Sequence, residues 1–507
     1  MTMSKIFADK NLIVDKISDS IYGSFLEHLG RAIYTGIYEP DHPMADGSGF
    51  RQDVIQLIRD LGVSVVRYPG GNFVSGYDWK DGIGRKEDRK ARLELGWRSI
   101  EPNTFGTDEF IQWCRATDTQ PMLAFNMGTG TQRDALEYFE YCNHPFGTYY
   151  SDLRRKNGAE QPYAVKYWCI GNEMDGLWQI CGTDADSYGK KALQTAHMIR
   201  CADCKGPDDP EAVQLIVCGS SKRELPTFPD WDRIVLEHTY DQVNYLSMHR
   251  YYEYMPEGPK PLEDFLCSAD DMNEFINAIR STINFVQEKK RSAHRVYISF
   301  DEWNIWKENQ LDVTPYWRMA PPILEDVYTF RDTIVFAGLM NTLLNNCDVV
   351  KVACLAQLVN VIAPIMTVPG GKCYKQGIYY PFAYASANAR GETLRAVVTC
   401  HKVYGAKRTA NALNVAVTHN EEKREVCVFA CNYSDRDDVA EVELRSFGKL
   451  RCAQFISLES DDLTITNTAD NPEFIQPINK KAVAVYEDCK ANVPMKAYSW
   501  NFLKFEY

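Results

Sequence analysis

The chain has 507 residues, of which 45% are hydrophobic and 12% aromatic, and its formal net charge is -13. This length can bury a large core and suggests two or three domains. The acidic balance and the lack of a dominant basic stretch argue against a nucleic-acid partner, and no apolar stretch is long enough to span a bilayer.

The N-terminal residues lack the apolar region of a secretory signal, so we expect a cytoplasmic protein. In that compartment the 16 cysteines should be reduced thiols, many of them in apolar runs. Cys201 and Cys204 form a Cys-x-x-Cys pair without a second pair at zinc spacing. We therefore expect no metal site there.

Eight short apolar runs of strand length occur in the first three quarters of the chain, and most are separated by segments with helical periodicity. The runs are 21–26, 63–68, 121–125, 165–170, 214–218, 245–248, 296–300 and 349–355. The clearest helical segments are 50–61, 108–117, 134–142, 184–204, 271–290 and 325–346. Strand–helix alternation repeated eight times predicts a (β/α)8 TIM barrel of class α/β, over residues 16–382.

From about residue 383 the pattern changes to apolar and polar residues at period two. The alternating segments are 413–418, 424–432, 439–446, 482–486 and 498–505. They predict a C-terminal antiparallel β-sandwich, to which the segment 5–14 could add a strand. The second domain is therefore expected to comprise residues 1–15 together with 383–507.

In a TIM barrel the chemistry lies at the C-terminal ends of the strands. The residues at those positions in this chain form a polar set. In chain order they are Glu27, Arg67, Asn72, Asn126, Asn172, Glu173, Ser220, Ser221, His249, Tyr251, Glu302 and Gln357. Such a set converging on one rim is a stronger signal than any single member.

Glu173 and Glu302 each end an apolar strand-like run. Glycosidic bond cleavage requires two carboxylates delivered in this way, one to protonate the leaving oxygen and one to attack or to activate water. Glu173 is the candidate acid/base and Glu302 the candidate nucleophile. The alternatives are a carboxylate bonded to a helix N-terminus and a structural ion pair. Period two puts Asp301 on the opposite side of its strand from Glu302, so only one of them should face the rim.

Arg67 could hold a nearby carboxylate ionised by charge pairing, although the Pro-Gly-Gly that follows it could be only a tight turn. His249 and Tyr251 share one strand face, and a lone histidine is more often structural. Three tryptophans could stack on a sugar ring or belong to the core: Trp97, Trp303 and Trp306.

These features together resemble an α-L-arabinofuranosidase of glycoside hydrolase family 51, over essentially the whole chain. The motifs that carry the resemblance are GSFLEH at 23–28, RYPGGN at 67–72, IGNE at 170–173, HRY at 249–251, SFDEWN at 299–304 and AQLVN at 356–360. The resemblance implies the same barrel and β-sandwich, and it implies a retaining mechanism without metal or cofactor.

The resemblance also implies roles for single residues. Glu173 would act as acid and then as base, and it should have a raised pKa in the free enzyme, whereas Glu302 would form a covalent arabinofuranosyl-enzyme. Asn172 would hold the sugar O2, and other furanose oxygens would be bound by Glu27, Asn72 and Gln357. Arg67 and Tyr251 would orient Glu302, His249 would support the acid/base side, and the pocket walls would be Trp97 and Trp306.

The implied substrates are arabinan- and arabinoxylan-derived oligosaccharides, trimmed by exo action, and the implied assembly is a trimer or hexamer. Pro102 stands where the family has Thr, and together with the loop 311–322 it leaves the linkage preference open. Two other readings remain: an endo-glucanase or xylanase on the same barrel, and a non-catalytic carbohydrate-binding protein.

Overall fold

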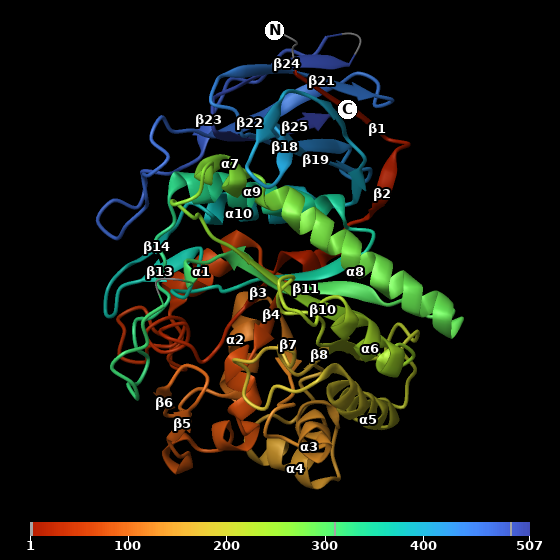
Figure 1. Ribbon diagram of the computed structural model, residues 1–507. Coiled ribbons are helices and arrows are strands. Elements are labelled where there is room, and N and C mark those ends of the chain that lie inside the picture. The colour runs from red at the N-terminus through yellow and green to blue at the C-terminus, as the bar shows by residue number, and fades with distance from the viewer. Residues whose placement is uncertain (1–3, 309–310, 487–488) are drawn as a thin grey trace.

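A computed structural model describes residues 4–308, 311–486 and 489–507. A barrel ringed by helices forms one part of the molecule, and two stacked sheets form the other (Figure 1). The first and the last strand of the described chain lie in these sheets. The first three residues of the predicted N-terminal segment lie outside the described part.

The barrel is closed, and its eight strands are paired in parallel throughout. They are β3 (Gly23–Phe25), β4 (Val65–Tyr68), β7 (Gln120–Ala124), β8 (Tyr167–Ile170), β9 (Gln214–Val217), β10 (Tyr245–Tyr252), β11 (Tyr297–Ile305) and β12 (Val350–Leu355). Each predicted run overlaps one of these strands. The predicted TIM barrel is therefore confirmed.

All six predicted helices are present, and the described residues hold four that were not predicted. They are α1 (Gln52–Leu61), α2 (Thr107–Thr117), α3 (Gln132–Asn143), α4 (Tyr149–Lys156), α5 (Ala185–Asp203), α6 (Asp230–Thr239), α7 (Pro261–Leu266), α8 (Ser268–Lys290), α9 (Phe330–Asn345) and α10 (Tyr379–Asn388). The segment predicted to begin at residue 325 becomes helical only at Phe330, because Thr329 is the N-cap and accepts a hydrogen bond from the Asp332 backbone. None of the described helices is both long and apolar enough to cross a membrane.

Helix α9 joins the two parts of the molecule. Nearly all its residues are buried, which is typical of a helix covered on every side. It contacts β11 on the barrel side and β19 (Leu413–Asn420) and β20 (Glu425–Asn432) on the other side. The side chains of Asn341 and Asn345 donate to the backbone of β19, so the sheets are hydrogen-bonded directly to a barrel helix.

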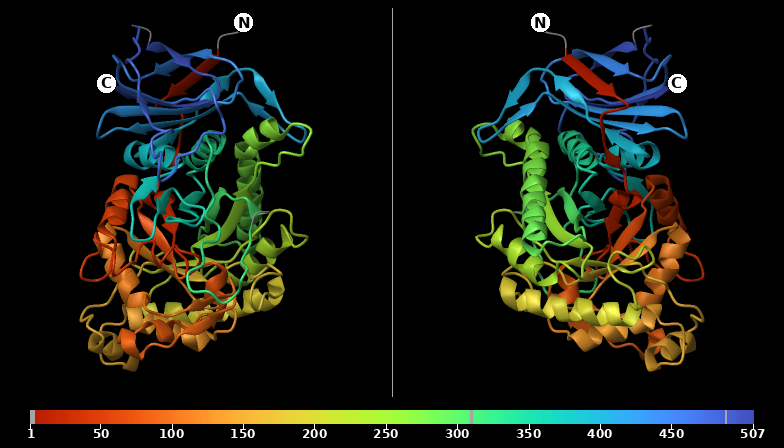
Figure 2. Two further views of the ribbon diagram at one scale, coloured as in Figure 1. Left: turned by 90° about the vertical axis from the view of Figure 1, so that its left-hand side faces the viewer. Right: turned by 90° about the vertical axis from the view of Figure 1, so that its right-hand side faces the viewer.

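The sheets are packed at one end of the molecule, away from α3 and α4 (Figure 2). One has seven strands: β2 (Ile13–Lys16), β15 (Glu392–Leu394), β19, β20, β25 (Ser499–Glu506), β22 (Arg451–Leu458) and β23 (Ile478–Asn479). The other has four: β16 (Val397–Thr399), β1 (Ser4–Asp9), β21 (Asp438–Arg445) and β24 (Lys490–Met495). The N-terminal segment thus supplies one strand to each sheet, and the β-sandwich is confirmed.

The strand predicted at 482–486 is wrong. Only Val485 makes a bridge there, to Ala491, and the strand that pairs with β21 is β24. The alternation arises because Val483 and Val485 pack against the sandwich core without belonging to a ladder. The described residues also form three small hairpins: β5 (Arg92–Glu94) with β6 (Ser99–Glu101), β13 (Ile365–Thr367) with β14 (Cys373–Lys375), and β17 (Lys402–Tyr404) with β18 (Thr409–Asn411).

Candidate active site

The turn after β8 places Asn172 and Glu173 at the C-terminal end of the barrel. Gly171 has a φ of 96°, a conformation that favours glycine, and a Cβ there would lie 2.9 Å from the Met127 Cβ. Glu173 itself has a φ of 43°, which is uncommon for a residue with a side chain. The backbone therefore turns sharply at the strand end, and the carboxylate enters the barrel opening.

A bulge in β11 places Asp301 and Glu302 on the same side. Ser247 pairs with Ser299 and His249 pairs with Glu302, so β11 has one residue more than β10 in this interval. Arg67 contacts both carboxylates, through Nε to Asp301 at 3.2 Å and through Nη1 to Glu302 at 2.7 Å. The prediction that period two puts Asp301 on the opposite side of the strand is wrong, because the extra residue breaks the alternation. Of the two carboxylates only Glu302 lines the cavity described below, as predicted.

A cavity of about 460 Å³ opens at these strand ends. Most of the predicted site residues line it: Glu27, Asn72, Trp97, Glu173, Tyr251, Glu302, Trp306 and Gln357. The other three, Arg67, Asn172 and His249, are buried beside the two catalytic candidates and bond to them or to each other. The structure thus brings together every residue predicted for the site.

Glu302 is held by two donors. Besides Arg67, the Tyr251 hydroxyl donates to its second oxygen at 2.8 Å. Burial raises the pKa of Glu302, the charges of His249 and Arg67 oppose this, and the Glu173 charge adds to it, so that the pKa lies above its usual value. The nucleophile candidate is thus oriented, and it is ionised only above the ordinary range of a glutamate.

Glu173 also has a donor on each oxygen. His249 Nδ1 lies 2.8 Å from one oxygen, and the indole N–H of Trp178 donates to the other at 2.6 Å. Burial would raise the pKa of Glu173, but the hydrogen bond and charge of His249, with the Trp178 bond, lower it below its usual value. The expectation of a raised pKa in the free enzyme is therefore wrong, because the imidazole lies directly against the carboxylate.

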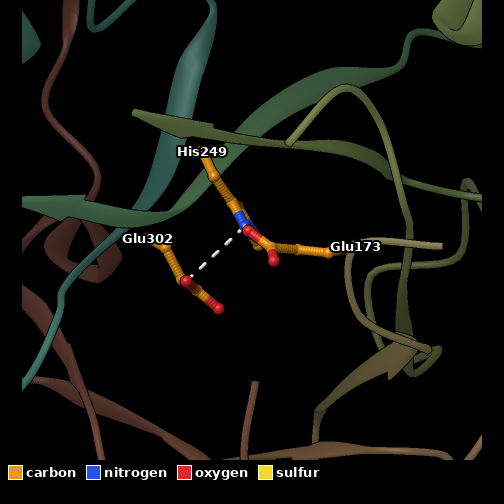
Figure 3. A group of neighbouring side chains, drawn as sticks. All are labelled: Glu173, His249 and Glu302. Atoms are coloured by element: carbon orange, nitrogen blue, oxygen red, sulfur yellow. Dashed lines mark hydrogen bonds and ion pairs between the residues drawn. The ribbon is translucent and has the colours of Figure 1, made fainter. Parts of the chain in front are cut away.

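His249 lies between the two glutamates, and the three side chains point towards one another (Figure 3). Its Nδ1 is 3.6 Å from Glu302, and its Nε2 is 3.5 Å from Asp301 and 3.2 Å from the Ser247 hydroxyl. Burial would lower the pKa of His249, but the surrounding carboxylates, Glu302 first, raise it well above its usual value. The surrounding carboxylates therefore favour the protonated form of the imidazole.

One oxygen of each glutamate and a ring nitrogen of His249 lie within 4.8 Å of one another. Retaining glycosidases have carboxyl groups about 5–5.5 Å apart, whereas inverting enzymes have them about 6.5–9.5 Å apart. The same three residues are the one group in the described chain that could offer a metal three ligands. The guanidinium of Arg67 on Glu302 opposes a cation there.

Glu27 lines the cavity. It accepts hydrogen bonds from the Phe73 backbone, from the Trp97 indole at 3.0 Å and from the Gln357 amide at 3.0 Å. Burial raises the pKa of Glu27 to about 8. Asn72 lies beside it at the start of the 3-10 helix η2 (Asn72–Gly76).

Two buried donors near the cavity have no protein partner within the described residues. They are the Nδ2 of Asn172, whose other amide atom accepts from Arg67 at 2.6 Å, and the indole N–H of Trp306. Buried polar groups are normally hydrogen-bonded. These two donors are therefore suited to a ligand with several oxygen atoms.

Other strand-end residues are structural. Asn126 holds its own loop through the Gly128 and Gly130 backbones, and the Ser220 hydroxyl donates to Asp232. The Ser221 backbone donates to Asp175. Trp303 belongs to the core and stacks on Phe336, with 5.1 Å between the ring centroids.

Several residues that line the cavity were not predicted, namely the buried Phe25 and the outer residues Leu95, Arg98, Trp178, Lys222 and Glu308. Within the loop 311–322, Leu311 and Val313 line the cavity, as expected from its position. Pro102 is not among the described residues that line the cavity. Its neighbour Glu101 accepts a hydrogen bond from His28 inside the fold. The signal for Trp178 was its closeness in sequence to Glu173, and Phe25 ends β3 within the GSFLEH motif. The other four lie on loops without a motif.

Two family profiles match the chain. One is described as an α-L-arabinofuranosidase 1 domain and matches residues 57–257, and the other is described as an α-L-arabinofuranosidase C-terminal domain and matches residues 301–499. Together they cover both catalytic candidates and most of the sandwich.

The chain is 42% identical to an intracellular exo-α-(1→5)-L-arabinofuranosidase of Acetivibrio thermocellus, over 99% of both chains. It is 42% identical to an exo-α-(1→6)-L-arabinofuranosidase of Bifidobacterium longum, over 92% of this chain and 90% of that one. A solved family 51 α-L-arabinofuranosidase from Bifidobacterium longum superposes with a TM-score of 0.94 at 37% identity, over 100% of each chain.

Proposed function

The chain belongs to the α-L-arabinofuranosidases of glycoside hydrolase family 51, and we propose that Glu302 is its nucleophile and Glu173 its acid/base. The enzyme is an exo-acting glycosidase that removes arabinofuranosyl residues with retention of configuration. The observation that carries the assignment is the short separation of the two carboxylates, with Arg67 and Tyr251 on one of them and His249 on the other.

In the first step a Glu302 oxygen attacks the anomeric carbon, and the bond from that carbon to the leaving oxygen breaks. The leaving oxygen takes a proton from Glu173. Arg67 and Tyr251 orient Glu302 for the attack, and both favour its ionised form against the burial that raises its pKa. The product of this step is an arabinofuranosyl ester of Glu302 and a free alcohol.

In the second step water attacks the same carbon. Glu173, now ionised, accepts a proton from that water, and the ester bond to Glu302 breaks. Two inversions give net retention. The two steps require neither a metal nor an organic cofactor.

The acid proton is shared between Glu173 and His249. The pKa of His249 lies well above its usual value because of the carboxylates around it, Glu302 first and then Asp301 and Glu173. The pKa of Glu173 lies below its own usual value because of its 2.8 Å contact with His249. A proton on Nδ1 can pass to the carboxylate when the leaving oxygen arrives, and esterification of Glu302 removes a charge that stabilises the imidazolium. His249 is thus proposed to store the proton that Glu173 delivers.

The arabinofuranosyl group is proposed to occupy the buried part of the cavity. The Nδ2 of Asn172, which has no partner among the described residues, is suited to donate a hydrogen bond to the sugar O2, next to the nucleophile. Other hydroxyls would be bound by Glu27, Asn72 and Gln357, and the walls would be Trp97 and Trp306. The terminal sugar of a chain fits such a site better than an internal one.

The substrates are arabinose-containing oligosaccharides. The name of the Acetivibrio relative supports an α-(1→5) linkage and an intracellular location, and the Bifidobacterium relative named for α-(1→6) cleavage shows how the linkage can differ at similar identity. We propose cleavage of α-(1→5)-linked arabino-oligosaccharides inside the cell. We also propose a catalytic barrel of residues 16–382, a sandwich domain of residues 1–15 and 383–507, and a trimer or hexamer.

Hydrolysis of 4-nitrophenyl α-L-arabinofuranoside, compared with the β-D-xyloside and β-D-glucoside, tests this function. We expect rapid release of 4-nitrophenol from the arabinofuranoside and almost none from the others. Preference for either other sugar, or no release from any of them, would contradict the proposal. Comparison of α-(1→5)-, α-(1→3)- and α-(1→2)-linked arabinobiose then tests the linkage.

A further inference from the structure

Trp178 binds the acid/base but lies on the exposed side of the cavity. Its indole N–H donates to Glu173 at 2.6 Å, while 41% of its surface is exposed. The ring lies against the backbone of Gly176, where a Cβ would come within 2.5 Å of it. A half-exposed indole can turn away from its acceptor unless something fixes the ring.

Lys222 provides that contact. Its ammonium group lies over the Trp178 ring, 5.0 Å from the centroid, a distance typical of a cation–π interaction. Lys222 follows β9, whereas Trp178 follows β8, so the contact bridges two neighbouring strand ends. The indole is therefore held between the Gly176 backbone and the ammonium group.

Glu308 fixes Lys222 in turn. Its two carboxylate oxygens lie 2.9 and 3.1 Å from the Lys222 Nζ. Both side chains line the cavity, with 32% and 52% of their surfaces exposed. Glu308 comes shortly after β11, the strand that carries Glu302. The contacts thus run from the segment after the nucleophile, through Lys222 and Trp178, to the acid/base.

An exposed ion pair contributes little to folding, so stability alone does not explain this arrangement. Its position explains more, because the pair lies on the outer wall of the cavity, where a leaving group must pass. The described side chains that contact Glu173 are His249 on one oxygen and Trp178 on the other. Loss of the indole contact would leave the carboxyl group free to rotate.

We propose that Lys222, anchored by Glu308, is a positioning residue for the acid/base: it fixes the Trp178 indole, which fixes the Glu173 carboxyl group towards the leaving oxygen. This inference rests on the proposed role of Glu173. It makes Lys222 important only for substrates whose leaving group needs protonation. The sugar hydroxyl that leaves from a natural oligosaccharide needs protonation strongly, whereas the 4-nitrophenolate leaving group needs it little.

The test is kcat/KM on α-(1→5)-arabinobiose and on 4-nitrophenyl α-L-arabinofuranoside. For Lys222→Met, which keeps the aliphatic stem, we expect about a tenfold loss on arabinobiose and less than about a twofold loss on the aryl substrate. Glu308→Gln should give the same pattern with smaller losses. Lys222→Arg, which keeps the positive charge, should retain most of the wild-type kcat/KM on both substrates. Lys190→Met, which removes the exposed lysine of the pair with Asp186 on α5, is the matched control and should change neither value.

Equal losses on both substrates, or no loss on either, would overturn the proposal. A second measurement is independent of turnover: ¹⁹F NMR of the protein labelled with 5-fluorotryptophan, with the Trp178 signal assigned by Trp178→Phe. In Lys222→Met that signal should shift and broaden, and an unchanged signal would overturn the proposal. If the wild-type enzyme cleaves neither arabinoside, the proposed function fails, while the NMR result still decides whether Lys222 positions the indole.

Discussion

The floor and the mouth of the cavity are built in different ways. The floor, here Arg67, Asn172, Glu173, His249 and Glu302, comes from the ends of β4, β8, β10 and β11, and all five residues are buried. The mouth, here Leu95, Arg98, Lys222, Glu308 and Leu311, comes from loops and is partly or largely exposed. The difference teaches which contacts are strong, because charges interact more strongly in the buried floor than at the wetted mouth.

The floor should therefore determine whether the reaction occurs, and the mouth should determine which leaving group is accepted. In the floor, one lost partner leaves a buried charge uncompensated. At the mouth, water replaces a lost partner. Substitutions in the two regions should accordingly differ by orders of magnitude in rate.

The largest effect is expected for Glu302→Gln. Removing the nucleophile removes a whole step of the mechanism, and kcat should fall by about four orders of magnitude or more on every arabinofuranoside. Steady-state assays of purified enzyme at high concentration measure the residual rate. Near-normal turnover in this variant would exclude Glu302 as the nucleophile.

Glu173→Gln should distinguish the substrates by leaving group. We expect about a thousandfold loss of kcat/KM on α-(1→5)-arabinobiose, since general acid catalysis contributes about 10²–10⁴-fold, and a much smaller loss on 2,4-dinitrophenyl arabinofuranoside. The ratio of the two losses is the quantity to measure. A ratio near one would contradict the acid role.

Asp301→Asn tests the bulge that puts Asp301 beside Glu302. The Arg67 charge loses one of its two buried partners, so the free energy of unfolding should fall by about 3 kcal/mol, measured by urea denaturation. Asp186→Asn, at an exposed ion pair, is the control and should leave the urea midpoint unchanged. A stable Asp301→Asn variant would mean that Arg67 does not depend on this carboxylate.

The pH profile tests the charges around the nucleophile. Because Glu302 must be ionised and its pKa is raised, the acid limb of kcat/KM should lie above the ordinary glutamate pKa of about 4.5. The charge of His249 lowers the pKa of Glu302, so His249→Asn should move this limb to higher pH. A limb that stays in place or moves down would contradict a charged His249.

The smallest effect is expected at the mouth. Leu95→Ala and Leu311→Ala each remove part of the apolar outer wall, and kcat/KM on 4-nitrophenyl arabinofuranoside should change by less than about threefold. The relative rates on the linkage isomers of arabinobiose should change more than this. A hundredfold loss on the aryl substrate would remove the distinction between floor and mouth.

Much of the floor could be predicted from the sequence because strand periodicity marks where each strand ends, and the polar residues there stand out. The bulge could not be predicted, since the extra residue in β11 is visible only by comparison with the pairing in β10. The low pKa of Glu173 depends on a histidine 76 positions away in the chain. In the sequence Lys222 and Glu308 are indistinguishable from ordinary exposed charges. The structure distinguishes them, because Lys222 lies over the Trp178 ring and Glu308 contacts Lys222.

In the sandwich, period two identified most long strands but also gave a strand at 482–486 that the fold does not form. Alternation reports which side chains face the core, and it does not report whether the backbone joins a ladder. Two of the longer strands were missed: β22, whose buried residues do not alternate, and β24, whose buried residues do.

The most direct test of the account is azide rescue of two variants with the product configuration determined by NMR. Glu173→Ala with azide should form the arabinofuranosyl azide of retained configuration, because azide attacks the ester on Glu302. Glu302→Gly with azide should form the azide of inverted configuration, because azide takes the place of the nucleophile. If the two configurations are exchanged, or if neither variant is rescued, the roles assigned to Glu173 and Glu302 are wrong.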